Sequence, residues 1–277
     1  MPTKELQNDR IVDADEVIGN IIDNGDTSVK FTYALSKTSN RISTEADDLE
    51  DFRMQILRRH AETDENGQLE YTQENGTVKA KFEDEDARSE FEKDLREIYG
   101  DTSEVEFHEV DVKHAGDYVL GTDEARTIRF MISGLPEETV QLSGSEIEAS
   151  VNTLQSMLVE DAANDDYSPA QLPFGLTVAA IDNAEALMEI QRSMEEKRQE
   201  LLKQHAETDE DGNLVTVEDT DRAKFPGDEA QEEYQEAMRE VYLEDYSFQA
   251  KKVNIDFLNE GDVEPGQMVV VEWMFDE

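Results

Sequence analysis

Ten residues occur twice in this chain: His60–Leu69 reads HAETDENGQL, and His205–Leu214 reads HAETDEDGNL, 145 positions later and with eight of ten residues identical. A repeat of this length indicates that one unit is written twice, and internal repetition determines the architecture before any other feature. Asn66-Gly67 and Asp211-Gly212 are turn dipeptides, because both residue types tolerate a positive φ. We therefore expect the same turn in both halves.

The likeness between the halves continues on both sides of this phrase. Downstream, an offset of 143 residues pairs Phe82 with Phe225 and the run Arg96–Tyr99 with Arg239–Tyr242. Upstream, the offset of 145 pairs apolar residues of the two long helices that the sequence predicts. The duplication therefore covers most of the chain.

The segment Ser133–Glu138 contains Gly and Pro and lies between the two copies. It predicts two domains, residues 1–136 and residues 137–277, each near the commonest size for a domain with its own core. The second copy carries an insertion around residues 161–169, whose composition is typical of a surface loop.

The spacing of apolar residues predicts an α+β fold with two homologous units, each a short helix, a long-helix hairpin and a small antiparallel sheet. In the first unit Asp13 or Asp15 would cap the short helix, and in the second Ser143 or Ser145 would. The other expected elements are long helices at about 27–62 and 173–207, a β-hairpin at 69–82 with a weaker counterpart at 214–225, four-turn helices carrying Phe91-Leu95-Ile98 and Tyr234-Met238-Val241, and strands at about 104–112, 126–132, 246–257 and 267–275.

The chain has 69 acidic and 25 basic residues, a formal charge of −44. Repulsion at this charge destabilises a compact state in dilute buffer, whereas molar salt shortens the screening length to about 3 Å. The composition therefore predicts adaptation to multimolar salt, as in haloarchaea or their viruses. The alternatives are an ordinary acidic protein and a mimic of DNA, but the acids are spread over both halves as on a solvated surface.

Several classes of function have no support in the sequence. It has no cysteine, no phosphate-binding loop and no nucleophile elbow or zinc-protease motif. Basic residues are too sparse for nucleic-acid binding, and no apolar run is long enough to span a membrane. The N-terminus does not resemble a secretory signal. We expect no catalytic residue, no cofactor, no metal and no membrane or nucleic-acid partner, in a protein made in the cytoplasm.

The histidines His60 and His205 occupy equivalent positions in the last turn of each long helix, where capping or packing explains them better than catalysis. The second acidic turn partly matches a calcium loop, with Glu207 at position 1 and Glu218 at position 12. The first copy has Gln73 where the bidentate acid belongs. A turn in an acidic protein therefore accounts for the same residues, and specific cation binding stays open.

The run Met268–Phe275 is the most apolar in the chain and contains its only Trp. As an interior strand it would be core. As an edge strand it would pair with a neighbouring subunit or another partner. The partner-interface candidates on this strand are Val269, Val271, Trp273 and Phe275.

The repeated phrase, preceded by a short and a long helix and followed by a hairpin and a helix with Glu90–Leu95, resembles an uncharacterised family of small tailed-phage proteins. Members of that family have a single unit, so this chain would be a tandem pair. The resemblance implies a viral context, and with the acidic composition it indicates a tailed virus of haloarchaea. We expect a non-enzymatic component of the capsid surface, neck or tail that binds other virion proteins or further copies of itself. The alternative is an assembly chaperone or adaptor in the host cytoplasm that the virion does not retain.

Overall fold

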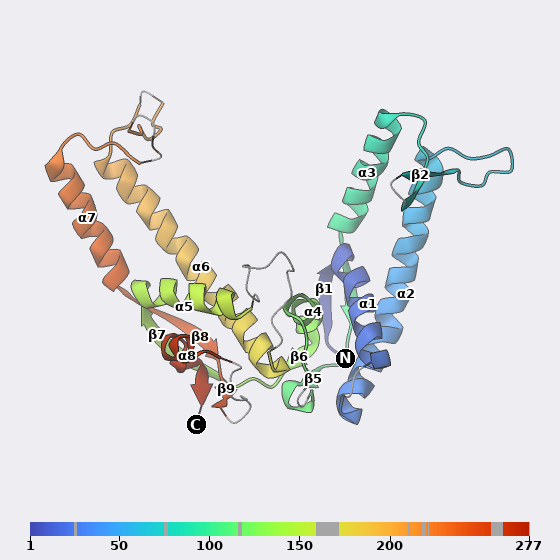
Figure 1. Cartoon of the computed structure of the whole chain (residues 1–277), viewed down its shortest axis with the longest axis horizontal. Helices are drawn as coiled ribbons and strands as arrows, with labels where there is room; N and C mark the ends of the chain where they lie inside the picture. Colours follow the sequence, from blue (N-terminus) through green and yellow to red (C-terminus); the bar gives the residue numbers. More distant parts are fainter. Residues whose placement is uncertain are drawn as a thin grey trace. The chain divides into compact units, whose positions relative to one another are not determined.

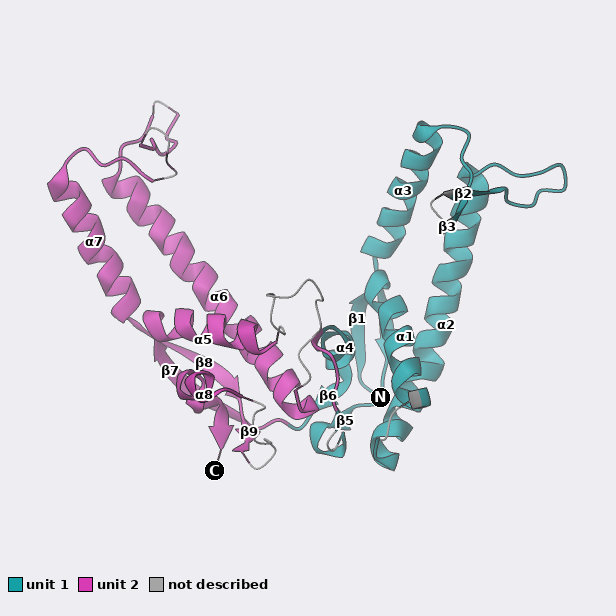
Figure 2. Cartoon of the chain, viewed as in Figure 1, with its two compact units in different colours: residues 1–118, 123–134 teal, residues 119–122, 135–277 magenta. Residues whose placement is uncertain are grey.

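The computed structural model of the chain describes residues 1–24, 27–74, 77–115, 118–158, 172–209, 211–217, 220, 222–255 and 263–276. Over these residues the protein is a mixed α+β structure in which helices predominate and strands form two-stranded sheets. The chain divides into two compact units (Figure 2). Unit 1 comprises Met1–Tyr118 and Asp123–Gly134, and unit 2 comprises Val119–Thr122 and Leu135–Glu277.

Unit 1 is built around one long helix. Its elements are β1 (Thr3–Gln7), α1 (Asn8–Asn24), α2 (Val29–His60), β2 (Tyr71–Glu74), β3 (Thr77–Ala80), α3 (Glu85–Gly100), β4 (Thr102–Glu106), β5 (Val110–Asp111), α4 (Thr122–Ile128) and β6 (Ile132–Ser133). Strands β1 and β4 pair antiparallel, as do β2 and β3, whereas the short strands β5 and β6 are parallel. Figure 1 shows α2 and α3 side by side as a helical hairpin, with β2 near its far end.

The core of unit 1 lies where α1 covers the first half of α2. Apolar side chains at helical spacing on both helices are fully buried there, among them Ile11, Ile18, Phe31, Leu35 and Ile42. Burying a side chain of this size contributes about 1.5–3 kcal/mol.

Side chains cap the N-terminal ends of two helices of unit 1. Helix α2 begins after Ser28, whose hydroxyl accepts the Phe31 N–H, and α3 begins after Asp84, whose carboxylate accepts the Ala87 N–H. Such caps satisfy backbone donors that have no partner inside a helix.

Unit 2 has its elements in the same order. They are β7 (Glu137–Ser143), α5 (Gly144–Met157), α6 (Phe174–His205), α7 (Asp228–Leu243), β8 (Asp245–Lys251), β9 (Val253–Asn254), α8 (Pro265–Val270) and β10 (Phe275–Asp276). Strands β7 and β8 pair antiparallel, and β9 and β10 pair parallel. The hairpin β2–β3 is replaced here by one isolated bridge, Thr216 to Ala223, whereas the bridge Thr208 to Leu214 has its counterpart in the bridge Thr63 to Leu69 of unit 1.

Each long helix has a buried polar residue whose side chain bonds to the backbone of a neighbouring segment. In unit 1 this segment follows β4, and in unit 2 it is the end of β8. The Thr38 hydroxyl of α2 accepts the His108 N–H at 3.0 Å. In α6 the Asn183 Oδ1 accepts the Lys251 N–H at 2.7 Å, and its Nδ2 donates to the Lys251 carbonyl at 2.9 Å. Offsets of 145 and 143 relate these two arrangements, which are the offsets found in the sequence.

Several predicted elements are confirmed and others are wrong. Both long helices, both four-turn helices, the first hairpin and the Ser143 cap are present. The strand predicted at 126–132 is instead the end of α4 followed by a 3-10 turn, Arg129–Met131. The first short helix begins at Asn8, well before Asp13 and Asp15, and strands β1 and β7 were not predicted. The predicted insertion at 161–169 lies outside the described residues.

Candidate interaction groove on the first arm

The second half of each long helix continues beyond the core as part of an arm. We call residues 49–96 the first arm and residues 194–239 the second arm. After Ile42, the buried residues of α2 are Leu49, Ile56 and Leu57, and α3 has no buried residue. The arms therefore contribute little core and present mostly surface.

The repeated phrase forms the turn at the end of each long helix. In the first arm the Asp64 carboxylate accepts the N–H groups of Asn66 at 2.8 Å and Gln68 at 2.9 Å, and Gly67 has a φ of 75°. These backbone donors stabilise the ionised carboxylate and lower the pKa of Asp64. A positive φ favours glycine because other residues place a Cβ against the backbone.

The second arm repeats this turn. The Asp209 carboxylate accepts the N–H groups of Asp211 at 3.0 Å and Asn213 at 2.8 Å, Gly212 has a φ of 82°, and the pKa of Asp209 is lowered in the same way. The repeated phrase thus has a structural explanation. In the described part of the chain no group of three or more acidic or histidine side chains is placed to hold a metal, and Glu218 of the calcium pattern lies outside that part.

The two equivalent histidines join the helices of each arm. The His60 Nε2 lies 2.9 Å from the Asp94 carboxylate of α3, and the His205 Nδ1 lies 3.5 Å from the Glu233 carboxylate of α7. Both histidines are largely covered. This is a packing contact between helices, as expected for residues at a helix end.

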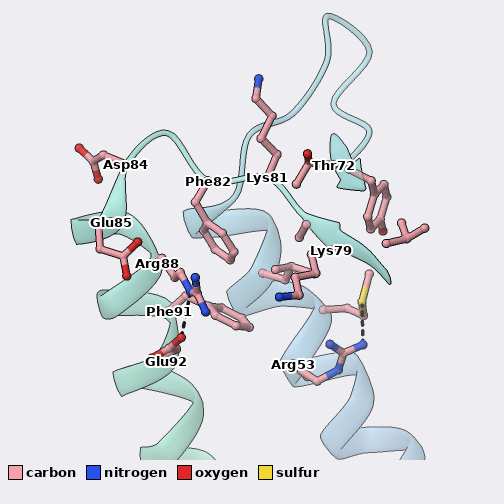
Figure 3. A pocket seen from close by; sticks show the side chains of 15 residues that line it. Arg53, Thr72, Lys79, Lys81, Phe82, Asp84, Glu85, Arg88, Phe91 and Glu92 are labelled. Carbon is pink, nitrogen blue, oxygen red and sulfur yellow. Dashed lines mark hydrogen bonds and ion pairs between the residues drawn. The ribbon is translucent and has the colours of Figure 1, made fainter. Parts of the chain in front are cut away.

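A groove of about 810 Å³ lies on the first arm between α2, α3 and the hairpin β2–β3 (Figure 3). Its floor contains the buried Leu57 and the rings of Phe82 and Phe91, whose centroids are 5.3 Å apart. The hairpin adds two exposed apolar side chains, Tyr71 at 57% and Val78 at 66% exposure. Ladder pairs Tyr71–Ala80 and Gln73–Val78 place both on one face of the hairpin.

The lining of the groove contains both cationic and acidic side chains. Its lining includes four cationic side chains, Arg53, Lys79, Lys81 and Arg88, against three carboxylates, Asp84, Glu85 and Glu92. Three of these cations are in ion pairs, Arg53 with Glu50, Lys81 with Glu62 and Glu70, and Arg88 with Glu92, so the groove carries no excess of positive charge. Aromatic and arginine side chains are common in protein-binding sites, whereas lysine and acidic side chains are depleted there.

The cations of the groove also hold the arm together. Arg53 bonds to Glu50 at 2.6 Å, and Arg88 bonds to Glu92 at 3.1 Å. Because Glu50 stabilises the guanidinium, the pKa of Arg53 is raised. The Lys81 ammonium pairs with Glu62 and Glu70, and the Lys81 backbone N–H donates to the Glu70 carbonyl oxygen at 2.9 Å. These pairs are at the surface, where each contributes at most about 1 kcal/mol.

The C-terminal candidates do not form the strand that was predicted for them. Met268–Val270 belong to helix α8, and a 3-10 turn covers Glu272–Met274. Pro265 and a capping box between Glu264 and Gln267 start the helix and override the β preference of the valines.

Without the strand, the four candidate side chains do not alternate on one face. Val269 is 71% exposed, and Val271 is fully buried. The Trp273 indole N–H donates to Ser150 Oγ at 3.2 Å, and Phe275 pairs with Val253 in the β9–β10 ladder. All four candidates belong to unit 2, and the groove of the first arm, in unit 1, was not predicted from the sequence.

Comparison of the chain with models of known families, with curated proteins and with solved structures finds no match. No helix among the described residues is both long and apolar enough to cross a membrane.

Proposed function

We propose that this chain is a non-enzymatic structural and interaction component of a haloarchaeal tailed-virus particle, on the capsid surface, neck or tail, and that it consists of two homologous units fused in tandem. The observation that carries the proposal is the doubled arm. Each unit extends a long two-helix arm that buries few residues of its own and carries the repeated phrase at its end.

The tandem origin is supported by contacts that recur at the offsets of the sequence repeat. The ring pair Phe82–Phe91 has its counterpart in Phe225–Tyr234, again with centroids 5.3 Å apart. In unrelated units, two ring pairs would not be expected to share both the same centroid distance and the sequence offset of the repeat. A duplicated unit inherits both.

The particle context rests on the resemblance of the repeated phrase to small tailed-phage proteins and on the charge of −44. An arm with little core of its own is stabilised further when a partner covers it, as happens in a particle where neighbours repeat. Two related arms in one chain would then offer two related attachment surfaces.

Quantitative mass spectrometry of virus particles tests this proposal. Particles would be purified on a density gradient in about 2–4 M salt, where the charge of this chain is screened, and then washed. We expect the chain at a fixed ratio to the major capsid protein after repeated washing. Absence from washed particles would contradict the proposal. Presence only in the infected-cell lysate would support the alternative, an assembly chaperone or adaptor that is not retained.

A further inference from the structure

We propose that this chain associates head to tail with further copies of itself, with residues 263–272 of one copy covering the exposed start of helix α2 in the next. This inference deepens the proposed function and rests on its tandem origin, because it compares equivalent positions of the two units. Two observations carry it: one apolar helix face is covered in unit 2 and exposed in unit 1, and the charges beside the two proposed contact surfaces are complementary.

The two long helices begin with apolar side chains on the same face. In α2 these are Val29 and Tyr33, and the offset of 145 pairs them with Phe174 and Val178 of α6. Residues four positions apart lie on one face of a helix. We call Val29, Tyr33 and the next residue at this spacing, Lys37, the α2 face. Because its first two positions are apolar in both copies, this apolar surface is a feature of the unit and not of one copy.

The two units differ in how far this face is covered. In unit 2, Phe174 and Val178 are fully buried. In unit 1, Val29 is 86% exposed and Tyr33 is 56% exposed. Burial of such side chains is favourable, so an apolar face that is covered in one copy and exposed in the other lacks a cover that the unit can accept.

A segment from the first copy takes part in covering the start of α6. Residues 119–122 lie in the sequence of the first copy but belong to unit 2. Val119 forms a β-bridge with Pro173, the residue before α6, and Leu120 is buried. The Thr122 hydroxyl donates to the Leu158 carbonyl oxygen at 2.8 Å. The segment that precedes α4 in one copy is thus built into the start of the long helix of the next copy.

The second copy has the equivalent segment before helix α8. The offset of 143 pairs Leu120 with Val263 and the start of α4 with the start of α8. Leu120 is 1% exposed, whereas Val263 is partly exposed and Val269 of α8 is 71% exposed. The two copies provide two such segments and two such helix starts, and unit 2 uses one of each. A further copy of the chain supplies the missing partner for the remaining segment and for the α2 face.

The charges beside the two surfaces agree with this pairing. Lys37 is exposed, its ammonium lies over the Tyr33 ring, and it forms no ion pair among the described residues. Glu272, in the turn after α8, is also exposed. The repeat pairs Lys37 with Asp182 and Glu272 with Arg129, so both signs are reversed together. A contact between these two positions would therefore join opposite charges whichever copy supplies the helix.

A contact between two different patches also suits an assembly of many copies. Such a head-to-tail contact either closes into a ring or repeats without end, whereas a twofold contact stops at a dimer. A twofold dimer through the α2 face would bring two Lys37 side chains together, because it apposes the same patch of both copies. In molar salt the screening length is about 3 Å, so the charges act only in direct contact and determine which surfaces fit.

Sedimentation velocity of the full chain in about 2 M KCl, over a wide range of concentration, tests the association. We expect oligomers that grow with concentration. Val29→Asp should weaken association by about tenfold or more, because the contact would then bury a carboxylate. An acid at the first position of α2 suits the helix N-terminus, so the helix should still form. The matched control is Val78→Asp, 66% exposed elsewhere in unit 1, which should associate like the unmodified chain.

Exchanging the charges tests which surfaces meet. Lys37→Asp and Glu272→Arg introduce the residues of the other copy, and each alone should weaken association by about three- to tenfold. The double variant should associate like the unmodified chain. An equimolar mixture of the two single variants should also recover, because each then meets the opposite charge on the other. Failure of both to recover would overturn the pairing of these surfaces.

A second mixture distinguishes head-to-tail contact from a symmetric dimer. Val29→Asp leaves the segment before α8 intact, and Val263→Asp leaves the α2 face intact. Each variant alone should be monomeric, and their mixture should form dimers that do not grow further. Circular dichroism in the same salt must show unchanged helicity, and if Val263→Asp lowers it, the mixture of the two charge variants decides instead. A mixture that stays monomeric overturns the head-to-tail contact.

The other outcomes also decide the question. A chain that is monomeric at every concentration, or a loss of association with Val78→Asp equal to that with Val29→Asp, would overturn the inference. So would protection of the α2 face that does not depend on concentration, because the segment of the same chain would then cover it. If association fails while the chain is found in washed particles, only this inference falls. Absence from particles would contradict the proposed function even if the purified chain associates.

Discussion

Truncating Asn183 should destabilise unit 2 far more than an ordinary polar substitution does. Asn183 is fully buried in α6, and its side chain satisfies both backbone groups of Lys251 at the end of β8, at 2.7 and 2.9 Å. The change Asn183→Ala leaves a backbone donor and a backbone acceptor without their partner and opens space beside them. A buried polar group that loses its partner is more costly than a hydrogen bond that is never formed.

The magnitude follows from the two bonds. Each group left unsatisfied costs about 1–3 kcal/mol, and Lys251 is partly exposed, so we expect about 2–4 kcal/mol for Asn183→Ala. The matched variant is Asn183→Thr, because unit 1 has Thr38 at this position and uses its hydroxyl to accept the His108 N–H. The threonine should restore about half of the loss, since it replaces the acceptor and not the donor.

The assay must separate the two units, because a chain with two cores need not unfold in one step. Urea titration in about 2 M KCl keeps the ionic strength constant, which guanidinium would not. Hydrogen exchange with mass spectrometry would follow peptides of β8 and β4 separately. A loss below about 0.5 kcal/mol in β8, or equal loosening of β4 in unit 1, would refute the role given to Asn183.

Three further predictions concern packing, pH and salt. A Cβ on Gly144 would lie 2.8 Å from the Val241 carbonyl oxygen, so Gly144→Ala should destabilise the fold by about 1–3 kcal/mol. Gly19 has open space around it, so Gly19→Ala should stabilise helix α1 by about 0.5–1 kcal/mol. Thermal melts of the two variants would measure both changes. Titration of the carboxyl ¹³C signals should give Asp64 and Asp209 midpoints below the usual pKa of about 3.9. Because the pKa of each group is lower in the folded state, the ionised carboxylates stabilise the turns at any pH above the unfolded pKa. This stability is lost as the pH falls through the folded pKa. Dilution from about 2 M to about 0.05 M KCl should reduce helicity, and full helicity in dilute buffer would contradict the role given to the charge of −44.

The elements predicted correctly are those that local chemistry specifies. The long helices have apolar residues at helical spacing, and polar caps such as Ser143 mark their neighbours. The turn of the repeated phrase depends on Asp64 and Gly67, which act within five residues of each other. No distant part of the chain is needed to form such features.

The strands show where local pattern is insufficient. In β1 the buried residue is Leu6 alone, so the segment has no clear alternation, and its partner β4 lies almost a hundred residues away. In the segment Met268–Phe275 the opposite happens, because β-branched residues predict a strand and the preceding capping box starts a helix. Glu is not a usual first residue of a capping box, so the box at Glu264 and Gln267 is evident only in the structure, and Pro265 at the first helical position is the signal that the sequence contained.

The groove of the first arm could not be predicted from one segment, because α2, α3 and the hairpin each supply part of its lining. Comparing the two copies still separates its residues into two kinds once the fold is known. A position that both copies keep apolar and that is buried, such as Leu57, is explained by packing. A position that is apolar in one copy, polar in the other and exposed, such as Tyr71, is not explained by packing, because the second arm forms without it. Phe52, which is exposed and is paired with Lys197 by the repeat, shows the same pattern, so the pattern identifies surface positions that the two copies do not share.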